Sequence, residues 1–389
     1  MQLGYDQYLY FIWQISGVCG ILCKNRCFVH IVIMFGIKLF GSSSYLGVDI
    51  GTTAIKIAEI GKDSSGLELK NYGILESYGH LERVNNAIQT SSLKIMEADT
   101  IELLKKLVRH SNFKSKDAIA SIPAFSAFIT LFEMPQMKDS DIAKAMQFQI
   151  GQYIPLPITE VSIDWLKVGE RQDEQGFIKE QILLVSIPNE IIEKYRRIFT
   201  AAGLTLRALE IESLALLRAV TDADMPTTLL VDIGARSTNI SVIDKGTLRY
   251  NYQTDMSGAG ITHALAGGLG VKIRRAEKLK KERGILGGSE SELSTLMMPF
   301  IDAILSEAKR AQLKYEQNFN NRIAQVIITG GGAKMPGIIP YAQEQFGLPV
   351  TIGDPFRRVH YPPVLEPIIR DIGPSFAVAI GLGVKEFSE

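Results

Sequence analysis

The sequence repeats one short pattern, Val-Asp-Ile-Gly, once in each half of the chain, at residues 48–51 and 231–234. Each copy ends an aliphatic run typical of a strand, and small hydroxyl-bearing residues lead from it into a second predicted strand. The same letters in the same strand–turn–strand context, once per half, indicate an internal duplication. A chain of 389 residues is long enough for two such domains.

Each copy supplies a carboxylate near the end of a strand and a glycine two residues later, Asp49 with Gly51 and Asp232 with Gly234. Glycine lets a backbone turn approach a ligand closely, and the amides that follow can form a nest for phosphate oxygens. We therefore expect two turns that hold a triphosphate from both sides. The expected phosphate-binding residues are Gly51, Thr52, Thr53 and Lys56 in the first half and Gly234, Ser237 and Thr238 in the second.

Asp49 and Asp232 are the expected magnesium-binding residues. They would act through water molecules, because Mg²⁺ gives up its hydration shell reluctantly. The alternative is a pair of ordinary hairpins with buried aspartates, which is unfavourable because aspartate is depleted in strands and a buried carboxylate needs a cation or donors. A P-loop is excluded, since the sequence has no GxxxxGK[ST] and its glycine turns lead into strands.

A third glycine element follows a buried strand predicted at residues 324–329. Three consecutive glycines permit a flat ligand to approach the backbone, and the GxGxxG spacing of a dinucleotide-binding loop is not met. Upstream, Glu277 and Lys280 lie on one face of a predicted helix, where they would bind ribose and adenine edges unless the face is simply solvated. The expected nucleotide-binding set here is Glu277, Lys280, Gly330, Gly331, Gly332 and Met335.

The rest of the chain reads as mixed α and β structure. Strands are predicted at 45–50, 54–60 and 66–74, a surface loop at 77–99 and an amphipathic helix at 100–110. Residues 116–205 read, in the order β–β–α–β–β–α, as an inserted α+β module. We therefore predict a first domain over 45–225 that contains this module, and a second domain over 226–389.

Residues 1–44 precede the first domain as a leader. Its two apolar runs are interrupted at residues 24–26, and neither reaches the ~18–20 residues that cross a bilayer. No basic residue precedes the first run, which argues against a secretory signal. We interpret residues 1–33 as a start-site artefact, with translation beginning at Met34; a membrane-touching leader is the alternative.

Composition excludes two classes of function. Lys plus Arg and Asp plus Glu both number 42, so the chain has no net positive charge to attract nucleic acid. The five histidines are scattered, and the three cysteines, Cys19, Cys23 and Cys27, all lie in the leader at a spacing that fits no common metal site.

Taken in order, these motifs resemble the two phosphate loops and the adenosine elements of the actin, sugar-kinase and heat-shock ATPase superfamily, over residues 45–385. The resemblance implies a duplicated actin-like (ribonuclease-H-like) α/β fold of two domains with an inserted α+β module, and ATP and Mg²⁺ as cofactors. It places hinge helices at 210–213 and 373–383, the second returning from domain II to domain I. It also implies Glu212, or alternatively Glu210, as the residue that orients a hydrolytic water, with at most slow ATP hydrolysis.

Within this superfamily, residues 149–157, 164–165, 202–213 and 257–262 resemble the PilM family of type IV pilus assembly proteins. That resemblance implies a cytoplasmic scaffold, peripheral on the inner face of the inner membrane. Its expected partners are the cytoplasmic tail of a PilN-type inner-membrane protein and other components of the pilus machine, with membrane contact through these partners and self-association left open. The tail would lie in a groove beside the module, near residues 153–157, unless that stretch is only a rigid turn.

Two alternatives remain. The related FtsA family of membrane-associated cell-division proteins also carries an inserted module, but it normally has an amphipathic membrane helix beyond the hinge helix, which residues 384–389 do not resemble. An actin-fold small-molecule kinase is less favoured, because no extra substrate-binding segment lies near Asp232.

Overall fold

The two Val-Asp-Ile-Gly segments end two equivalent central strands, β2 (Ser44–Ile50) and β10 (Thr228–Ile233). The computed structural model describes residues 33–34, 43–76, 97–138, 141–142, 145–146, 151, 153–172, 175–286 and 292–388. Every residue of β2 is buried, and so is every residue of β10 except Asp232, which is partly buried. Continuous aliphatic strands of this kind are covered on both faces.

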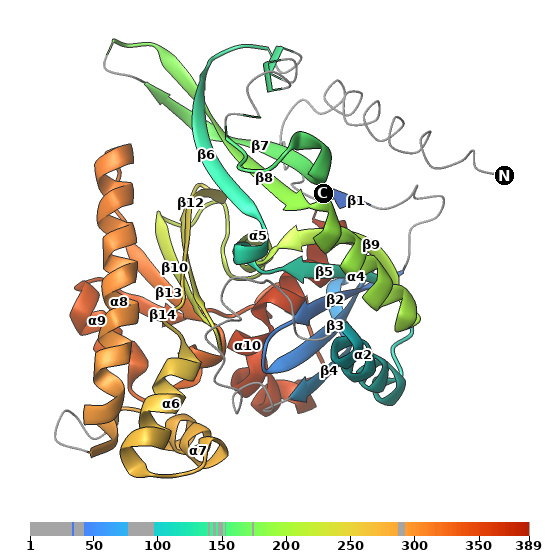
Figure 1. Cartoon of the computed structure of the whole chain (residues 1–389), viewed down its shortest axis with the longest axis vertical. Coiled ribbons are helices and arrows are strands. Elements are labelled where there is room, and N and C mark those ends of the chain that lie inside the picture. The colour runs from blue at the N-terminus through green and yellow to red at the C-terminus, as the bar shows by residue number, and fades with distance from the viewer. Residues whose placement is uncertain are drawn as a thin grey trace.

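The two sheets share one topology (Figure 1). In domain I the order is β1-β9-β5-β2-β3-β4-β15, and in domain II it is β12-β11-β10-β13-β14. In both, the central strand pairs antiparallel with the next strand in the chain and parallel with a later one. The duplication predicted from four letters is therefore confirmed by the order and direction of five strands in each half. The remaining strands are β1 (Ile33–Met34), β3 (Ala54–Asp63), β4 (Gly66–Glu76), β5 (Asp117–Ile122), β9 (Thr205–Ile211), β11 (Thr238–Asp244), β12 (Thr247–Thr254), β13 (Gln325–Thr329), β14 (Val350–Ile352) and β15 (Val359–His360).

The inserted module is smaller than predicted. It contains a three-stranded antiparallel sheet of β6 (Phe128–Pro135), β7 (Val161–Gln172) and β8 (Ile178–Pro188), in the order β6-β8-β7. Strand β5, expected to open the module, pairs in parallel with β2 and β9 in the large sheet instead. The predicted range 116–205 thus includes β5 and the start of β9, because the module is spliced into the crossover that these two parallel strands require.

Helix α4 (Asn189–Ala201) completes that crossover and packs against α2 (Glu97–Ser111) and β9. It takes the place that α9 (Ile338–Phe346) has between β13 and β14 of domain II. One face of the module sheet has a hydrophobic core of its own, and the other face contributes Val168, Leu183 and Val185 to the large core of domain I. The buried members of the module's own core include Phe132, Met134, Ile142, Met146, Ile154, Val161, Ile182 and Leu184.

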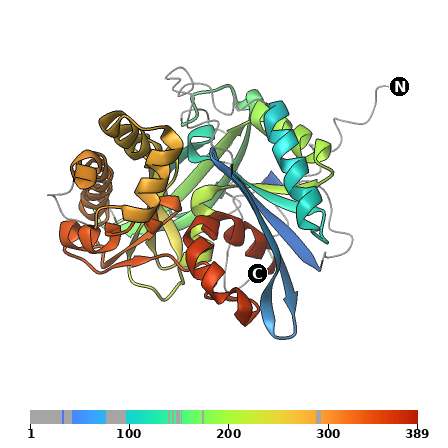
Figure 2. The ribbon, with the colours of Figure 1, turned by 90° about the horizontal axis from the view of Figure 1, so that it is seen from below.

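Two helices lie where the domains meet, α5 (Glu212–Val220) and α10 (Glu366–Val384) (Figure 2). Helix α10 packs on α5 and across β2 and β3, so it belongs to the core of domain I although it follows domain II in sequence. The stretch Pro363–Phe387 is the one in the described part of the chain that is long and apolar enough to cross a membrane. Because 67% of its most apolar window is buried inside the fold, we assign it to the core.

Domain II adds α6 (Gly258–Leu269), α7 (Ile273–Arg283) and the long helix α8 (Glu292–Phe319). Short 3₁₀ turns are η3 (Ala124–Ser126), η5 (Ile158–Glu160), η7 (Gly331–Lys334), η8 (Pro363–Leu365) and η9 (Lys385–Phe387). The predicted helix at 100–110 begins three residues earlier, at Glu97, and most of the predicted loop before it lies outside the described residues. So does most of the predicted leader, of which Ile33 and Met34 form β1 on the edge of β9.

Candidate nucleotide site

Asp49 is held from two sides at the end of β2. It lies directly opposite Lys56 on β3, whose Nζ is 2.9 Å from its Oδ2. On the other side Ser121, near the end of β5, donates its hydroxyl to Asp49 Oδ1 at 3.2 Å. Burial alone would lower the pKa of Lys56, but Asp49, with Asp232 and Glu212, raises it above its usual value. Lys56 is therefore a fixed cation beside the first turn.

Asp232 and Glu212 bring two more carboxylates to this place. Asp232 is the last residue but one of β10, and Glu212 is the first residue of α5. Burial raises the pKa of Asp232 to about 6, with Lys56 opposing and Asp49 adding to the rise. Burial also raises the pKa of Glu212 to about 8, and the charges of Asp49 and Asp232 contribute. Asp232 is close enough to Asp49, and Glu212 to both aspartates, for their charges to shift its pKa. Both domains therefore direct negative charge into one space.

This charge fits a bound cation. Three carboxylates and one ammonium leave an excess of negative charge. Burial raises the pKa values of Asp232 and Glu212, and the neighbouring carboxylates add to the rise, so a bound cation would favour their charged forms. Within the described ranges, no group of three or more His, Cys, Asp or Glu side chains is placed to hold a metal ion directly. Carboxylates such as Asp49 and Asp232 are of the kind that can hold a hydrated Mg²⁺ through its waters.

The structure distinguishes the two glutamates that the sequence left open. Glu210, on β9, is 2% exposed, and Arg218 binds both of its carboxylate oxygens, at 2.6 and 2.7 Å. This ion pair joins β9 to α5 and occupies Glu210 completely. Glu212, by contrast, is near enough to Asp49 and Asp232 for both to shift its pKa. Of the two, Glu212 is the one placed at the site.

The two predicted phosphate turns close in the same way. The amide of Gly51 donates to Ala54 O at 3.0 Å, and that of Gly234 donates to Ser237 O at 3.0 Å. The second turn also contacts the start of α6, where the Gly258 amide donates to Gly234 O. Thr238 does not match the expectation for a phosphate ligand: it is fully buried, and its hydroxyl donates to Met256 O inside the fold.

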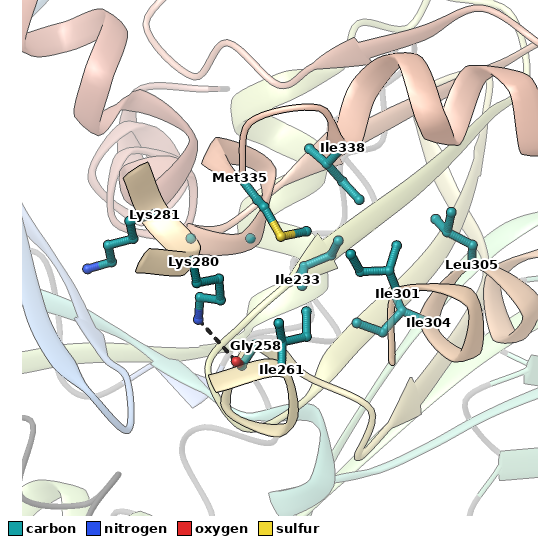
Figure 3. A pocket seen from close by; sticks show the side chains of 12 residues that line it. Ile233, Gly258, Ile261, Lys280, Lys281, Ile301, Ile304, Leu305, Met335 and Ile338 are labelled. Carbon is teal, nitrogen blue, oxygen red and sulfur yellow. Dashed lines mark hydrogen bonds between the residues drawn. The ribbon is translucent and has the colours of Figure 1, made fainter. Parts of the chain in front are cut away.

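The pair Glu277 and Lys280 lies at a pocket in domain II and not on a solvated face (Figure 3). Lys280 lines the pocket, its Nζ is 2.6 Å from Glu277 Oε2, and only about a tenth of each side chain is exposed. Thr262 donates its hydroxyl to Glu277, and Lys280 donates to Gly258 O at 3.0 Å. Burial lowers the pKa of Lys280, against the opposing charge of Glu277. The pair thus sits between the pocket and the second phosphate turn.

Most of the pocket wall is aliphatic. Met335, Ile338, Ile301 and Ile261 point into it (Figure 3), and Gly331 and Gly332 also line it. An apolar cavity with a few polar groups at its rim is the usual form of a small-molecule site. Its position next to the second turn suits the adenosine part of a nucleotide whose phosphates reach the carboxylates.

The three glycines have different surroundings. Gly330 has φ +80°, and a Cβ there would lie 2.3 Å from Asp232 Oδ1. A Cβ on Gly332 would lie 2.4 Å from the side chain of Ile233, whereas one on Gly331 would meet nothing within 4 Å. The Gly330 amide and the Thr329 hydroxyl both donate to Pro374 O in α10, at 3.0 and 3.1 Å. The glycine loop is thereby attached to the hinge helix.

Gly331→Val is expected to leave the fold intact and to weaken nucleotide binding at least ~10-fold, with or without magnesium. A Cβ at residue 331 would meet no atom within 4 Å, so the added side chain enters open space at the pocket, where the base would lie. Calorimetric titration with ATP, with and without Mg²⁺, measures the effect. Unchanged affinity in a folded Gly331→Val protein would place the base elsewhere.

Comparison with known proteins identifies the family of this chain. The family model described as type IV pilus assembly protein PilM matches residues 47–387. The chain belongs to the PilM family. Among solved structures, it is similar to the PilM-PilN type IV pilus biogenesis complex, with a TM-score of 0.75 at 20% identity over 89% of this chain and 99% of that chain.

Further similarities are more distant. FtsA of Enterococcus hirae is 24% identical over 84% of this chain and 81% of its own length, and FtsA of Pseudomonas aeruginosa is 22% identical over 80% and 83%. The ethanolamine utilization protein EutJ from Carboxydothermus hydrogenoformans superposes with a TM-score of 0.53 at 18% identity over 88% of this chain and 90% of that one. MreB 5 of Spiroplasma citri bound to AMPPNP gives 0.50 at 12% identity over 90% and 96%. These likenesses confirm the actin-like fold predicted for this PilM family member, with FtsA proteins as relatives.

Proposed function

We propose that this PilM family member is an ATP-binding scaffold of type IV pilus assembly that holds Mg-ATP between its two domains. The observation that carries the proposal is that Asp49, Asp232 and Glu212 lie near one another beside Lys56. Each domain contributes one of the two turns at this place. Magnesium, when bound, would supply the positive charge that offsets the triphosphate and these carboxylates. Asp49 and Asp232 would hold its water shell, and Lys56 and the two turns would face the phosphates.

The proposed hydrolysis is slow. With a pKa of about 8, Glu212 carries a proton at neutral pH unless a cation approaches, and a protonated carboxyl cannot accept one from water. In the loaded site the charge of bound Mg²⁺ would favour the deprotonated form of Glu212, so its protonation state alone does not set the rate. The scaffold role needs nucleotide binding and domain closure more than turnover.

The proposed partner is the cytoplasmic tail of a PilN-type inner-membrane protein, which would keep the chain on the inner face of that membrane. Support comes from the family match and from the similarity of the fold to the PilM-PilN complex. Residues 153–157 were expected at the tail site, but Tyr153 stacks on Phe132 at 4.3 Å and Ile154 is buried in the module core. The exposed aromatic side chains at the junction, Phe125 at 54% and Phe128 at 37%, are better placed for an extended tail.

Removing the module tests the partner assignment. Phe128 and Ser186 are directly opposed in the antiparallel pair of β6 and β8, so their Cα atoms are roughly 5 Å apart. Residues 129–185 can therefore be replaced by a short Gly-Ser linker that keeps the chain crossings to β5 and β9, with the loss of Val168, Leu183 and Val185 from the core of domain I. We expect this variant to fold and to bind Mg-ATP, while its affinity for a synthetic PilN tail falls at least ~100-fold.

Calorimetry with each ligand separates the possible results. The intact chain binding both Mg-ATP and the tail would support the proposal. Tail binding that survives in the folded deletion variant would contradict the site at the module junction. Failure of the intact chain to bind Mg-ATP would contradict the nucleotide assignment itself.

A further inference from the structure

The inserted module contacts domain II as well as domain I. Strand β12 of domain II lies next to β6 and β7 of the module (Figure 1). The module therefore has two kinds of attachment. Two chain crossings, before β6 and after β8, join it to domain I, and its buried side chains Val168, Leu183 and Val185 belong to the large core of that domain. A set of side-chain contacts joins it to domain II.

Arg249, on β12, is the centre of these contacts. Its Nη1 donates to Val168 O on β7 and to Gln181 Oε1 on β8, the latter at 2.9 Å. The hydroxyl of Thr247 donates to the same Val168 carbonyl at 3.2 Å. Only 12% of the Arg249 side chain is exposed, and Asp244 lies 3.6 Å away on its own hairpin. Domain II thus inserts a buried guanidinium between two strands of the module.

The module is shaped to accept that guanidinium. The pairing of β7 with β8 shifts register between Lys167 and Gly169, and a bulge of this kind leaves a residue, here Val168, outside the regular ladder. Gly169 follows, and a Cβ at that position would lie 1.5 Å from Arg249 Nη1. Any side chain at residue 169 would therefore displace the arginine.

A second contact lies beside the first. Arg171, further along β7, donates to Asn318 O near the end of α8 at 3.0 Å. It is also 3.1 Å from Glu133 on β6, which accepts a hydrogen bond from Gln181 at 3.3 Å. All three strands of the module are thereby linked to β12 and α8. A buried guanidinium that loses its acceptors is strongly unfavourable, so module and domain II should move together.

We propose that Arg249 transmits the nucleotide state of the cleft to the partner site of the module. The inference rests on the proposed function. A change in the angle between the domains when Mg-ATP binds would turn domain II relative to domain I, and Arg249 would carry the module with it. The junction around Phe125 and Phe128, where the module leaves domain I, would then change shape. Tail affinity would depend on bound nucleotide through this contact.

The test measures tail affinity by calorimetry with and without saturating Mg-ATP, in the unchanged chain and three variants. In the unchanged chain Mg-ATP should change tail affinity ~5–150-fold, the range typical of coupled sites. Arg249→Ala removes the guanidinium that domain II contributes to the contact. Gly169→Ala changes the module side of the contact, where the added Cβ would displace the guanidinium. Both should reduce this change to less than ~2-fold while each ligand alone binds within ~3-fold of normal. Arg310→Ala is the matched control, since Arg310 contacts Tyr252 on the same strand from the solvent side.

The outcomes are distinct. Coupling that is lost in both contact variants and kept in Arg310→Ala supports the inference. Coupling that persists in a folded Arg249→Ala or Gly169→Ala protein overturns it, and so does an unchanged chain that binds both ligands independently. An unchanged chain that fails to bind Mg-ATP or the tail contradicts the proposed function instead. If Arg249→Ala does not fold, as judged by circular dichroism, Gly169→Ala alone decides.

Discussion

The variants Asp49→Asn and Asp232→Asn are expected to bind Mg-ATP at least ~10-fold more weakly than the unchanged chain, a loss of about 1.4 kcal/mol. Each substitution keeps the size of the side chain and removes one negative charge that would hold the magnesium water shell. Asp49→Asn also leaves Lys56 without the carboxylate 2.9 Å from its ammonium. Titration calorimetry in the presence of magnesium measures the effect.

Asp117→Asn is the control for these variants. Asp117 begins β5, at the opposite end of the same sheet, where it pairs with Arg207 at 2.8 Å. The Asp117→Asn variant should bind Mg-ATP with the affinity of the unchanged chain. Normal affinity in both Asp49→Asn and Asp232→Asn would contradict a clamp made from the two turns.

The same carboxylates predict how binding depends on pH. Asp232, with a pKa of about 6 in the ligand-free protein, gains a proton as pH falls through 6. The proton competes with the cation, because a protonated carboxyl carries no negative charge. Mg-ATP affinity should therefore fall between about pH 7 and 5 by more than the titration of ATP itself explains, and Asp232→Asn should remove the excess.

Gly47→Ala is expected to destabilise the protein by about 3 kcal/mol or more, because overpacking that requires the backbone to move lies at the upper end of such effects. A Cβ at Gly47 would lie 1.9 Å from Ala379 O and 2.5 Å from Gly383 N, both backbone atoms of α10. Neither atom can rotate away as a side chain would. The helix would have to separate from β2, in the centre of the domain I core.

Gly267→Ala is the matched control for this substitution. Gly267 lies within α6, and a Cβ there would meet nothing within 4 Å. Alanine should stabilise the helix by roughly 0.5–1 kcal/mol. Urea unfolding followed by circular dichroism measures both variants. Equal stability of Gly47→Ala and the unchanged chain would show that α10 does not pack on β2 as described.

Much of the fold was predictable because the duplication left the same letters at equivalent places. Short-range pairings, such as β2 with β3 and β10 with β11, follow from adjacent strand patterns. The boundary of the module did not follow, because residues 118–122 read as a strand in either sheet. Its membership is decided by parallel pairing with β2, about 70 residues earlier in the chain, and no local pattern carries that information.

The site shows the same limit. Asp49, Asp232, Lys56 and Glu212 were predicted, since each lies in or next to a recognisable motif. Ser121 was missed, although it holds Asp49, because its role depends on placing β5 beside β2. Thr238 was expected to face phosphate, but it is the first residue of β11 and lies inside the sheet. Side-chain direction at a strand end depends on register, which the letters alone do not specify.

The path of α10 has a consequence for how the chain is synthesised. Domain II is continuous in sequence from β10 to β14, so all its strands have left the ribosome before α10 does. Domain I cannot close its core until α10 arrives to cover β2, more than 300 residues after Gly47. Domains fold as units during synthesis, and contacts of high sequence separation form late. A ribosome-bound chain whose α10 is still inside the exit tunnel should therefore have a protease-resistant domain II and a protease-sensitive domain I. The apolar strands of domain I would be accessible to chaperones.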